Sequence, residues 1–353
     1  MKLAQNVSIV VITHNRSKFI ARMALALNKL DFGGKLIVSE SSSEENFIKS
    51  QNLIKNLNLE IQITHIHTPK NKEMTISQSM NFSFQEGIKG IETDYAMLTC
   101  DDDIPIPETL EKCQKFLDEQ GSYNGVNGEL PWYEINSASE KNNIFHFLGL
   151  KSRVKCNRTF GLEETTALGR LDQYLQNFYH TMFTVVRVTT YQNIFPPNTN
   201  EISFPHFCAD YNWMFGIALT GKIKHFDEPQ VVRQFHGENL GIKGENHPFP
   251  SYIESLATPS WSNDARLFKN NLTTLIMNLD TISEEEASKA ALEALRKITI
   301  LRLYKAEKNL NLKVILNRIK SELLFMRYRL PISNNYKLYQ NTISALTEYK
   351  HGF

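Results

Sequence analysis

The most constraining feature of the sequence is a run of apolar, mostly β-branched residues near its start. Residues 7–12 read VSIVVI and show no alternation between apolar and polar side chains. A strand with one face in water would alternate, so this run predicts a strand buried on both faces, as in parallel sheets. Helices must then cover both faces of the sheet, which predicts an α/β fold.

Strand and helix patterns alternate along the N-terminal part of the chain. They predict helices at residues 17–30, 44–57 and 76–87, and further strands at residues 36–39, 61–67 and 95–99. Strands joined by helices in this rhythm imply right-handed crossovers and a doubly wound sheet. Ligands of such sheets bind beyond the carboxyl ends of the strands. Polar turns follow at those ends, at residues 13–16, 40–42 and 101–103, so the pattern brings them to one edge.

The third of these turns consists of Asp101, Asp102 and Asp103. Carboxylates this close repel one another unless a positive charge offsets them, and Mg²⁺ or Mn²⁺ would do so. A cation held by one or two carboxylates commonly fills its other positions with water and phosphate oxygens, which indicates a diphosphate ligand. The alternative is a solvated acidic loop or a helix N-terminus, because Pro105, Pro107 and Glu108 open a helix whose dipole would favour carboxylates.

The chain of 353 residues is long enough for a large domain with an appendage. Further strand patterns occur at residues 183–188 and 231–235. From about residue 259 helical periodicity dominates, over residues 264–280, 283–309 and 312–329, with a candidate capping box at Ser283 and Glu286. We therefore expect one α/β domain at residues 1–258 and an α-helical appendage at residues 259–353.

Composition limits the classes of partner and compartment. Lys and Arg total 39 against 38 Asp and Glu, so the net charge of +1 gives no electrostatic reason to expect nucleic acid as a partner. The cysteines at positions 100, 113, 156 and 208 lack the C-x-x-C spacing of zinc sites, and we expect free thiols in a reducing compartment. The sequence shows neither a secretory signal nor a membrane span, which predicts a cytoplasmic location.

Residues 323–330 (LLFMRYRL) interleave basic and apolar side chains. This pattern is typical of a helix at a membrane surface, which would give the protein peripheral contact with the inner face of the membrane. It is also typical of an amphipathic helix that packs on the main domain. The sequence leaves both interpretations open and does not indicate an oligomeric state.

Several of these segments together resemble a known enzyme family. The segments are residues 9–16 (IVVITHNR), residues 36–43 (LIVSESSS), the pair Met80 and Asn81, and residues 95–104 (YAMLTCDDDI) followed by Pro107 and Leu110. Their order and spacing resemble the GT-A glycosyltransferases of family 2 over roughly residues 6–240. The resemblance implies a GT-A type doubly wound mixed sheet and a nucleotide-sugar donor.

The resemblance also implies roles for individual residues. The donor-binding set would be Thr13, Asn15, Arg16, Glu40, Asn81, Asp101, Asp102 and Arg233. Within it, Glu40 would face the base, Asp101 the ribose, and the fork of Arg233 the diphosphate. The aspartate run corresponds to the family's DXD motif, in which Asp103 would bind the metal and Asp102 would shape the turn. The family usually has aspartate where this chain has Glu40, and the alternative for Glu40 is a helix-capping carboxylate.

Residues 207–213 (FCADYNW) resemble the family's second acidic motif, with Asp210 as its only acid. The resemblance implies that Asp210 is the catalytic base of an inverting transferase, which needs one base for the acceptor hydroxyl. The alternative is that Asp210 caps a helix at residues 211–219. His236 would be a metal ligand or else a structural histidine. Tyr179 and His180 would face the acceptor or the sugar, unless these rings belong to the core.

We therefore expect a metal-dependent glycosyltransferase. It would use Mn²⁺ or Mg²⁺ to transfer a sugar from a nucleotide-diphosphate donor, expected to be a UDP-sugar, to a glycan or a lipid-linked acceptor. One alternative is a sugar nucleotidyltransferase, although such enzymes need a glycine-rich phosphate loop and residues 13–16 contain no glycine. The other is a catalytically inactive module that binds nucleotides or glycans.

Overall fold

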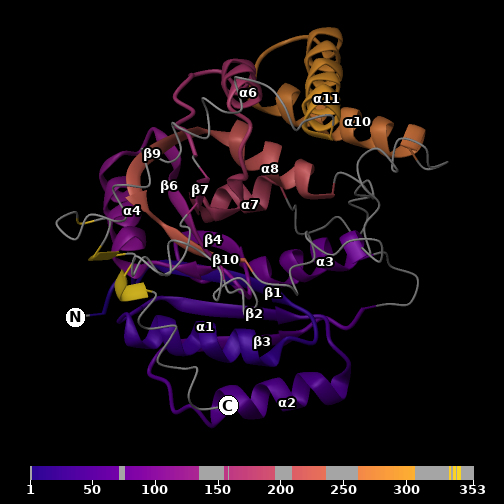
Figure 1. Cartoon of the computed structure of the whole chain (residues 1–353). Helices are drawn as coiled ribbons and strands as arrows, with labels where there is room; N and C mark the ends of the chain where they lie inside the picture. The colour runs from indigo at the N-terminus through magenta and orange to yellow at the C-terminus, as the bar shows by residue number, and fades with distance from the viewer. Residues whose placement is uncertain are drawn as a thin grey trace, which may run out of the picture.

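A computed structural model of the chain shows a mixed β-sheet with helices packed against it (Figure 1). The structure describes residues 2–70, 76–134, 155–157, 159–194, 209–235 and 261–306, and residues 334, 337, 338 and 340–342. Within these residues the strands form one ten-stranded sheet.

The N-terminal part contains the parallel strands that the sequence predicts. Its elements are β1 (Val7–Thr13), α1 (Ser17–Lys29), β2 (Lys35–Glu40), α2 (Glu44–Lys55), β3 (Gln62–His67), α3 (Ile76–Lys89) and β4 (Tyr95–Cys100). Every residue of β1 is buried, as its lack of alternation predicts. In the register of the sheet, Thr13 lies opposite Glu40, and Ile12 lies opposite Cys100. The three polar turns are therefore level with one another at one edge.

Helices cover both faces of these strands. In Figure 1, α1 and α2 lie below β1 to β3, and α3 lies above them beside α8 (Ala209–Thr220). Because α3 packs very closely on β1, a Cβ atom added at Gly87 would come within 2.6 Å of Val10 Cγ1. A side chain at this position would therefore push α3 away from the sheet.

The second part of the chain extends the sheet with antiparallel and parallel strands. Its elements are β5 (Ile104–Pro105), α4 (Pro107–Glu119), β6 (Tyr123–Glu134), β7 (Lys155–Asn157), α6 (Ala167–Gln176), the 3₁₀ turn η1 (Thr181–Phe183), β8 (Val185–Arg187), α7 (Val188–Ile194), α8, β9 (Lys222–Pro229) and β10 (Val231–Phe235). The strand order is β3-β2-β1-β4-β8-β6-β10-β5, and β7 and β9 pair with β6. Strand β8 runs antiparallel to both β4 and β6, whereas β9 and β10 run parallel to β6, so the sheet is mixed as expected.

The strand predicted at residues 183–188 is longer than the one observed. Phe183 belongs to the 3₁₀ turn, and α7 begins at Val188. Only Val185–Arg187 pair with the neighbouring strands β4 and β6. The pairing with β4 ends at Arg187, and the pairing with β6 ends at Val186. The Val188 N–H then bonds to the carbonyl of Asp94 as the chain turns into the helix.

The C-terminal helices α10 (Trp261–Leu279) and α11 (Glu284–Ala306) pack on α6 and α8. The Phe268 and Phe215 rings meet edge to face at 5.5 Å, so the appendage shares the main hydrophobic core. The capping box is present in part, since the Glu286 N–H donates to Ser283 Oγ at 3.2 Å. Residues 312–329 and 323–330 lie outside the described residues. Among the described helices, none combines the length and apolar character that crossing a bilayer requires.

One carboxylate anchors the appendage to the main domain. Asp280 lies between α10 and α11, and its two oxygens accept the Ala167 and Leu168 N–H groups at 2.8 and 2.9 Å. These N–H groups belong to the first turn of α6, which has no intrahelical acceptors for them. Asp280 therefore caps a helix that is distant from it in sequence.

We expect Asp280→Ala to lower the free energy of unfolding by about 1–2 kcal/mol, because two buried N–H groups lose their acceptors. The matched control is Asp172→Ala, since Asp172 is 61% exposed and contacts Lys297 at 3.5 Å. Its cost should stay within about 0.5 kcal/mol. Urea unfolding followed by circular dichroism measures both values. Equal losses in the two variants would show that Asp280 does not act as a cap.

Candidate active site

The aspartate run after β4 is buried. Asp101 is 2% exposed, Asp102 6% and Asp103 3%. The alternative of a solvated acidic loop is therefore wrong. Buried carboxylates are costly unless cations or hydrogen-bond donors compensate them.

Arg16 compensates one side of the triplet. Its guanidinium donates to Asp101 Oδ1 at 2.6 Å and lies 3.3 Å from Asp102 Oδ2. The guanidinium stacks over the Phe19 ring at 3.9 Å, which fixes its direction. Thr13 Oγ1 donates to the other oxygen of Asp101 at 2.6 Å. Both oxygens of Asp101 are thus held by the turn after β1.

Arg233 compensates the other side. Strand β10 pairs antiparallel with β5, which directly follows the triplet, and this pairing places Arg233 Nε 3.5 Å from Asp103 Oδ1. The guanidinium lies between the rings of Trp132 and Phe183, at 5.5 and 5.2 Å from their centres. Arg233 Nε is buried and makes no hydrogen bond to the described residues. An anionic ligand oxygen would satisfy this donor.

The charges of this cluster do not balance. Burial, helped by repulsion from Asp102, raises the pKa of Asp101 and of Asp103 from 3.8 to about 7. Arg16 opposes the shift of the Asp101 pKa, and Arg233 opposes that of Asp103. Three carboxyl groups face these two guanidinium groups, so a bound cation would relieve the remaining repulsion.

The donor set fits a divalent cation. Cys100 Sγ and one carboxylate oxygen each from Asp102 and Asp103 lie within 4.8 Å of one another. Two carboxylates suit Mn²⁺ or Mg²⁺, and the sulfur adds a softer donor. Our sequence interpretation treated Cys100 only as a free thiol. The available signal was its position, directly before the triplet at the last residue of β4.

The turns after β1 and β2 are joined. The Asn15 N–H donates to Ser42 Oγ at 2.6 Å, and the Ser41 N–H donates to the Thr13 carbonyl at 3.0 Å. Asn15 is exposed on this edge, with φ at 54° in the left-handed region. The predicted donor residues Thr13, Asn15 and Arg16 therefore lie together beside Asp101.

Glu40 is fully buried, at 0% exposure, and pairs with His65 Nε2 at 2.8 Å. Burial raises the pKa of Glu40, but the bonded His65 and the nearby hydroxyls of Ser42 and Ser50 outweigh burial and lower the pKa below 4.5. The capping alternative is not observed, because Ser43 caps α2. Glu40 lies at the predicted edge, where its described contacts tie β2 to β3.

The other predicted site residues come from α3, from the positions just before η1, from the start of α8 and from the position after β10. Asn81 is buried on α3, and its Nδ2 has no partner among the described residues. Tyr179 is buried, and its hydroxyl bonds to Asn127 and to the Phe160 carbonyl. The His180 ring lies 5.7 Å from Trp213 of α8. The Asp210 backbone lies in the first turn of α8, but its side chain lies outside the described part, as does all of His236.

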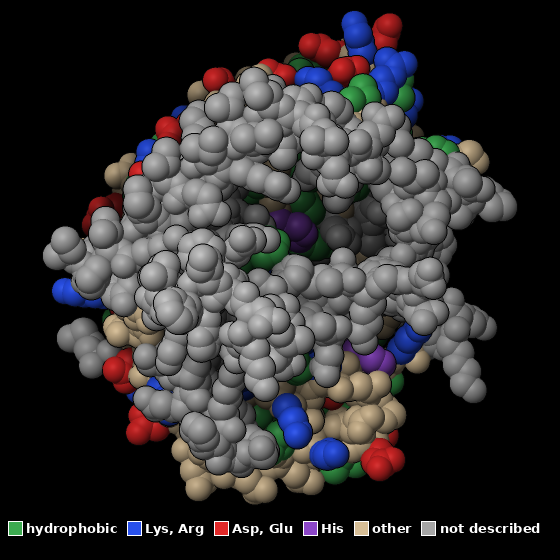
Figure 2. Space-filling view, in the orientation of Figure 1, with side chains coloured by type: hydrophobic (Ala, Val, Ile, Leu, Met, Phe, Trp, Pro, Cys, Tyr) green, Lys and Arg blue, Asp and Glu red, His purple; other side chains and the backbone are tan. Residues whose placement is uncertain are grey.

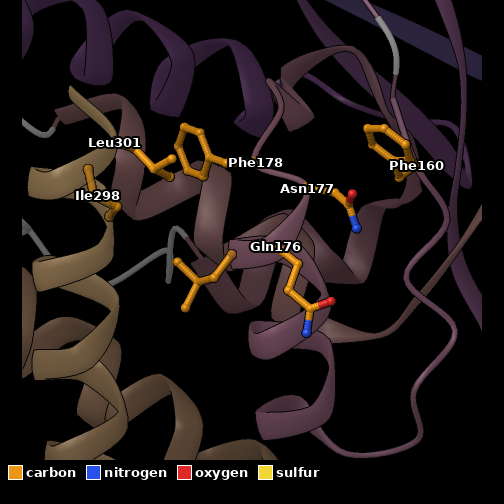
Figure 3. A pocket seen from close by; sticks show the side chains of 7 residues that line it. Phe160, Gln176, Asn177, Phe178, Ile298 and Leu301 are labelled. Carbon is orange, nitrogen blue, oxygen red and sulfur yellow. The ribbon is translucent and has the colours of Figure 1, made fainter. Parts of the chain in front are cut away.

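Figure 2 shows a hollow that contains a histidine and hydrophobic side chains. A second hollow, of about 280 Å³, lies between the end of α6 and α11 (Figure 3) and is lined by Phe160, Leu175, Gln176, Asn177, Phe178, Ile298 and Leu301. The Phe178 ring contacts the Tyr211 ring at 5.8 Å, so this second hollow adjoins the first turns of α8.

The raised pKa values predict how pH affects cation binding. Between about pH 4 and pH 7 the native triplet holds protons that the unfolded chain has lost, so the stability of the metal-free protein falls over this window as pH rises. A cation must displace those protons. We expect Mn²⁺ to raise the melting temperature more at about pH 8 than at about pH 5.5. Differential scanning fluorimetry with and without Mn²⁺ measures this, and an equal shift at both pH values would contradict it.

Comparison with known proteins shows the fold. No protein-family model matches the sequence, and no curated protein matches it. The structure of S. aureus TarS 1–349 aligns with 100% of this chain and 92% of its own, at 14% identity and a TM-score of 0.52. The same protein in complex with UDP-GlcNAc aligns over the same shares at 16% identity and a TM-score of 0.52. Despite this low identity, the chain has the fold of the GT-A glycosyltransferases, with a helical appendage at its C-terminus.

Proposed function

We propose that this chain is a glycosyltransferase that binds a nucleoside-diphosphate sugar through a divalent cation at the end of β4. The observation that carries the proposal is the buried triplet Asp101–Asp103. Its three carboxyl groups outnumber the guanidinium groups of Arg16 and Arg233, which contact them. The GT-A fold supports it, because a TarS structure with this fold holds UDP-GlcNAc. We assign the catalytic domain to residues 1–258 and the appendage to residues 259–353.

The residues divide between the two halves of the donor. Thr13, Asn15 and Arg16 lie around Asp101, so we assign them with Glu40 to the nucleoside and its ribose. Asp103, Asp102 and Cys100 supply the cation donors, and His236 is assigned as a further ligand. Mn²⁺ or Mg²⁺ held there would neutralise charge on the leaving diphosphate.

Arg233 serves the diphosphate. Its guanidinium is fixed between two aromatic rings, and its Nε lacks a hydrogen bond to the described residues. A fixed donor that faces developing negative charge stabilises the transition state without reorganising. We assign Asn81, whose buried Nδ2 is also unsatisfied within the described part, to the donor as well.

The acceptor side is assigned to α8 and the residues before it. Asp210, in the first turn of α8, is proposed as the base that takes the acceptor hydroxyl proton in an inverting transfer. His180 lies against Trp213 of the same helix, and we assign it with Tyr179 to the acceptor or the sugar. The acceptor class is a glycan or a lipid-linked glycan, and the donor is a UDP-sugar.

A nucleotide panel tests this proposal. We expect one nucleoside diphosphate of the panel, which we predict to be UDP, to raise the melting temperature only when Mn²⁺ is present. Asp103→Asn should lose the Mn²⁺-dependent rise in melting temperature. It should also weaken nucleotide binding at least about tenfold, because a cation donor is removed. The matched control is Asp94→Asn, an exposed aspartate bonded to Asn6 just before the other end of β4. It should bind UDP and Mn²⁺ as the wild type does.

Activity completes the test. The wild type should release UDP from a UDP-sugar when a suitable acceptor is supplied. An Asp103→Asn variant with full Mn²⁺-dependent binding would contradict the proposed cation site. Consumption of a nucleoside triphosphate with release of pyrophosphate would point instead to a nucleotidyltransferase.

A further inference from the structure

The turn after β1 has little support from its own residues. Asn15 adopts a left-handed backbone, which asparagine tolerates better than most residues but less readily than glycine, and its side chain contacts His14 Nε2 at 3.0 Å. Arg16, the N-cap of α1, makes no side-chain capping bond. This turn nevertheless carries the guanidinium that meets Asp101 at 2.6 Å, so something outside it must fix its position.

The loop after β2 provides that support. Ser42 Oγ accepts the Asn15 N–H at 2.6 Å, and Asn46 Nδ2 donates to Asn15 Oδ1 at 2.8 Å. His14 Nδ1 lies 3.0 Å from the Ser41 carbonyl. Ser42 is only 1% exposed, so its bond to Asn15 is shielded from competing water.

His67 of β3 holds this loop in turn. His67 Nε2 lies 2.9 Å from the Ser42 carbonyl, which is an acceptor, so this nitrogen is the donor. Nδ1 lies 3.0 Å from Glu44 Oε2, and the ring stacks on Phe47 at 4.4 Å with an interplanar angle of 12°. The ring is therefore fixed on both edges and on one face.

We propose that His67 is a positioning residue for the nucleotide, an inference that rests on the proposed function. His67 fixes Ser42, Ser42 fixes Asn15, and Asn15 sets the place of Arg16 beside Asp101. In the cation half, Asp103 receives its support from Arg233 and β10, and only Asp102 also contacts Arg16, at 3.3 Å. Loss of His67 should therefore weaken nucleotide binding far more than Mn²⁺ binding.

The test is calorimetric titration of the full chain with Mn²⁺ alone, and with UDP in the presence of Mn²⁺. His67→Ala should raise the Kd for UDP about tenfold, the order expected when one hydrogen bond is lost. Its Kd for Mn²⁺ should change much less than its Kd for UDP. His67→Gln should restore most of the UDP affinity, because the amide nitrogen of glutamine can take the place of Nε2.

The matched control is His225→Ala on β9. The His225 side chain is 22% exposed, against 18% for His67, and its Nδ1 lies 2.9 Å from Asn127 Oδ1. This variant should lose stability but bind UDP normally. Ser42→Ala removes the acceptor for the Asn15 N–H and should weaken UDP binding as His67→Ala does. It provides the test if the His67→Ala variant does not fold.

Unchanged UDP binding in either His67→Ala or Ser42→Ala would overturn the inference, as would an equal loss in His225→Ala. Failure of the wild type to bind UDP, GDP or any other nucleoside diphosphate with Mn²⁺ would overturn the proposed function and this inference together. If the wild type binds and the two variants bind equally well, only the inference fails.

Discussion

The site depends on the burial of three neighbouring carboxyl groups at the end of β4. The guanidinium groups of Arg16 and Arg233 make that burial tolerable, and they reach the triplet from opposite directions. Arg16 comes from the turn after β1, one strand away, and Arg233 comes from β10 through its pairing with β5. The fold must bring both arginines to one point, and the remaining negative charge then favours a cation.

The sequence predicts the parallel half of this arrangement well. The unalternated run in β1 and the polar turns are local patterns, and strand register carries them to one edge. Contacts between segments distant in sequence were not predictable in the same way. The Glu40–His65 pair requires the β2–β3 register, and the contact of Arg233 with Asp103 requires an antiparallel pairing between strands far apart in the sequence. Cys100 went unrecognised because one thiol beside acids carries no periodic signal.

The two halves of the site have separate supports. The nucleoside half rests on hydrogen bonds that run from β3 through the loop after β2 to Asn15. The cation half rests on the Trp132 and Phe183 rings near Arg233 and on the pairing of β10 with β5. Helix α8, which carries the proposed acceptor residues, packs on the appendage through the contact of Phe215 with Phe268. Each half can therefore be perturbed without the other, which makes their roles separable by mutation.

A crystal grown with UDP and Mn²⁺, measured with anomalous scattering at the manganese edge, tests the central claim most directly. The account predicts an anomalous peak within coordination distance of Asp103, beside Asp102 and Cys100 and bridged to a phosphate oxygen of UDP. It also predicts that Arg16 keeps its bond to Asp101. UDP bound at this edge with no manganese at the triplet would contradict the account.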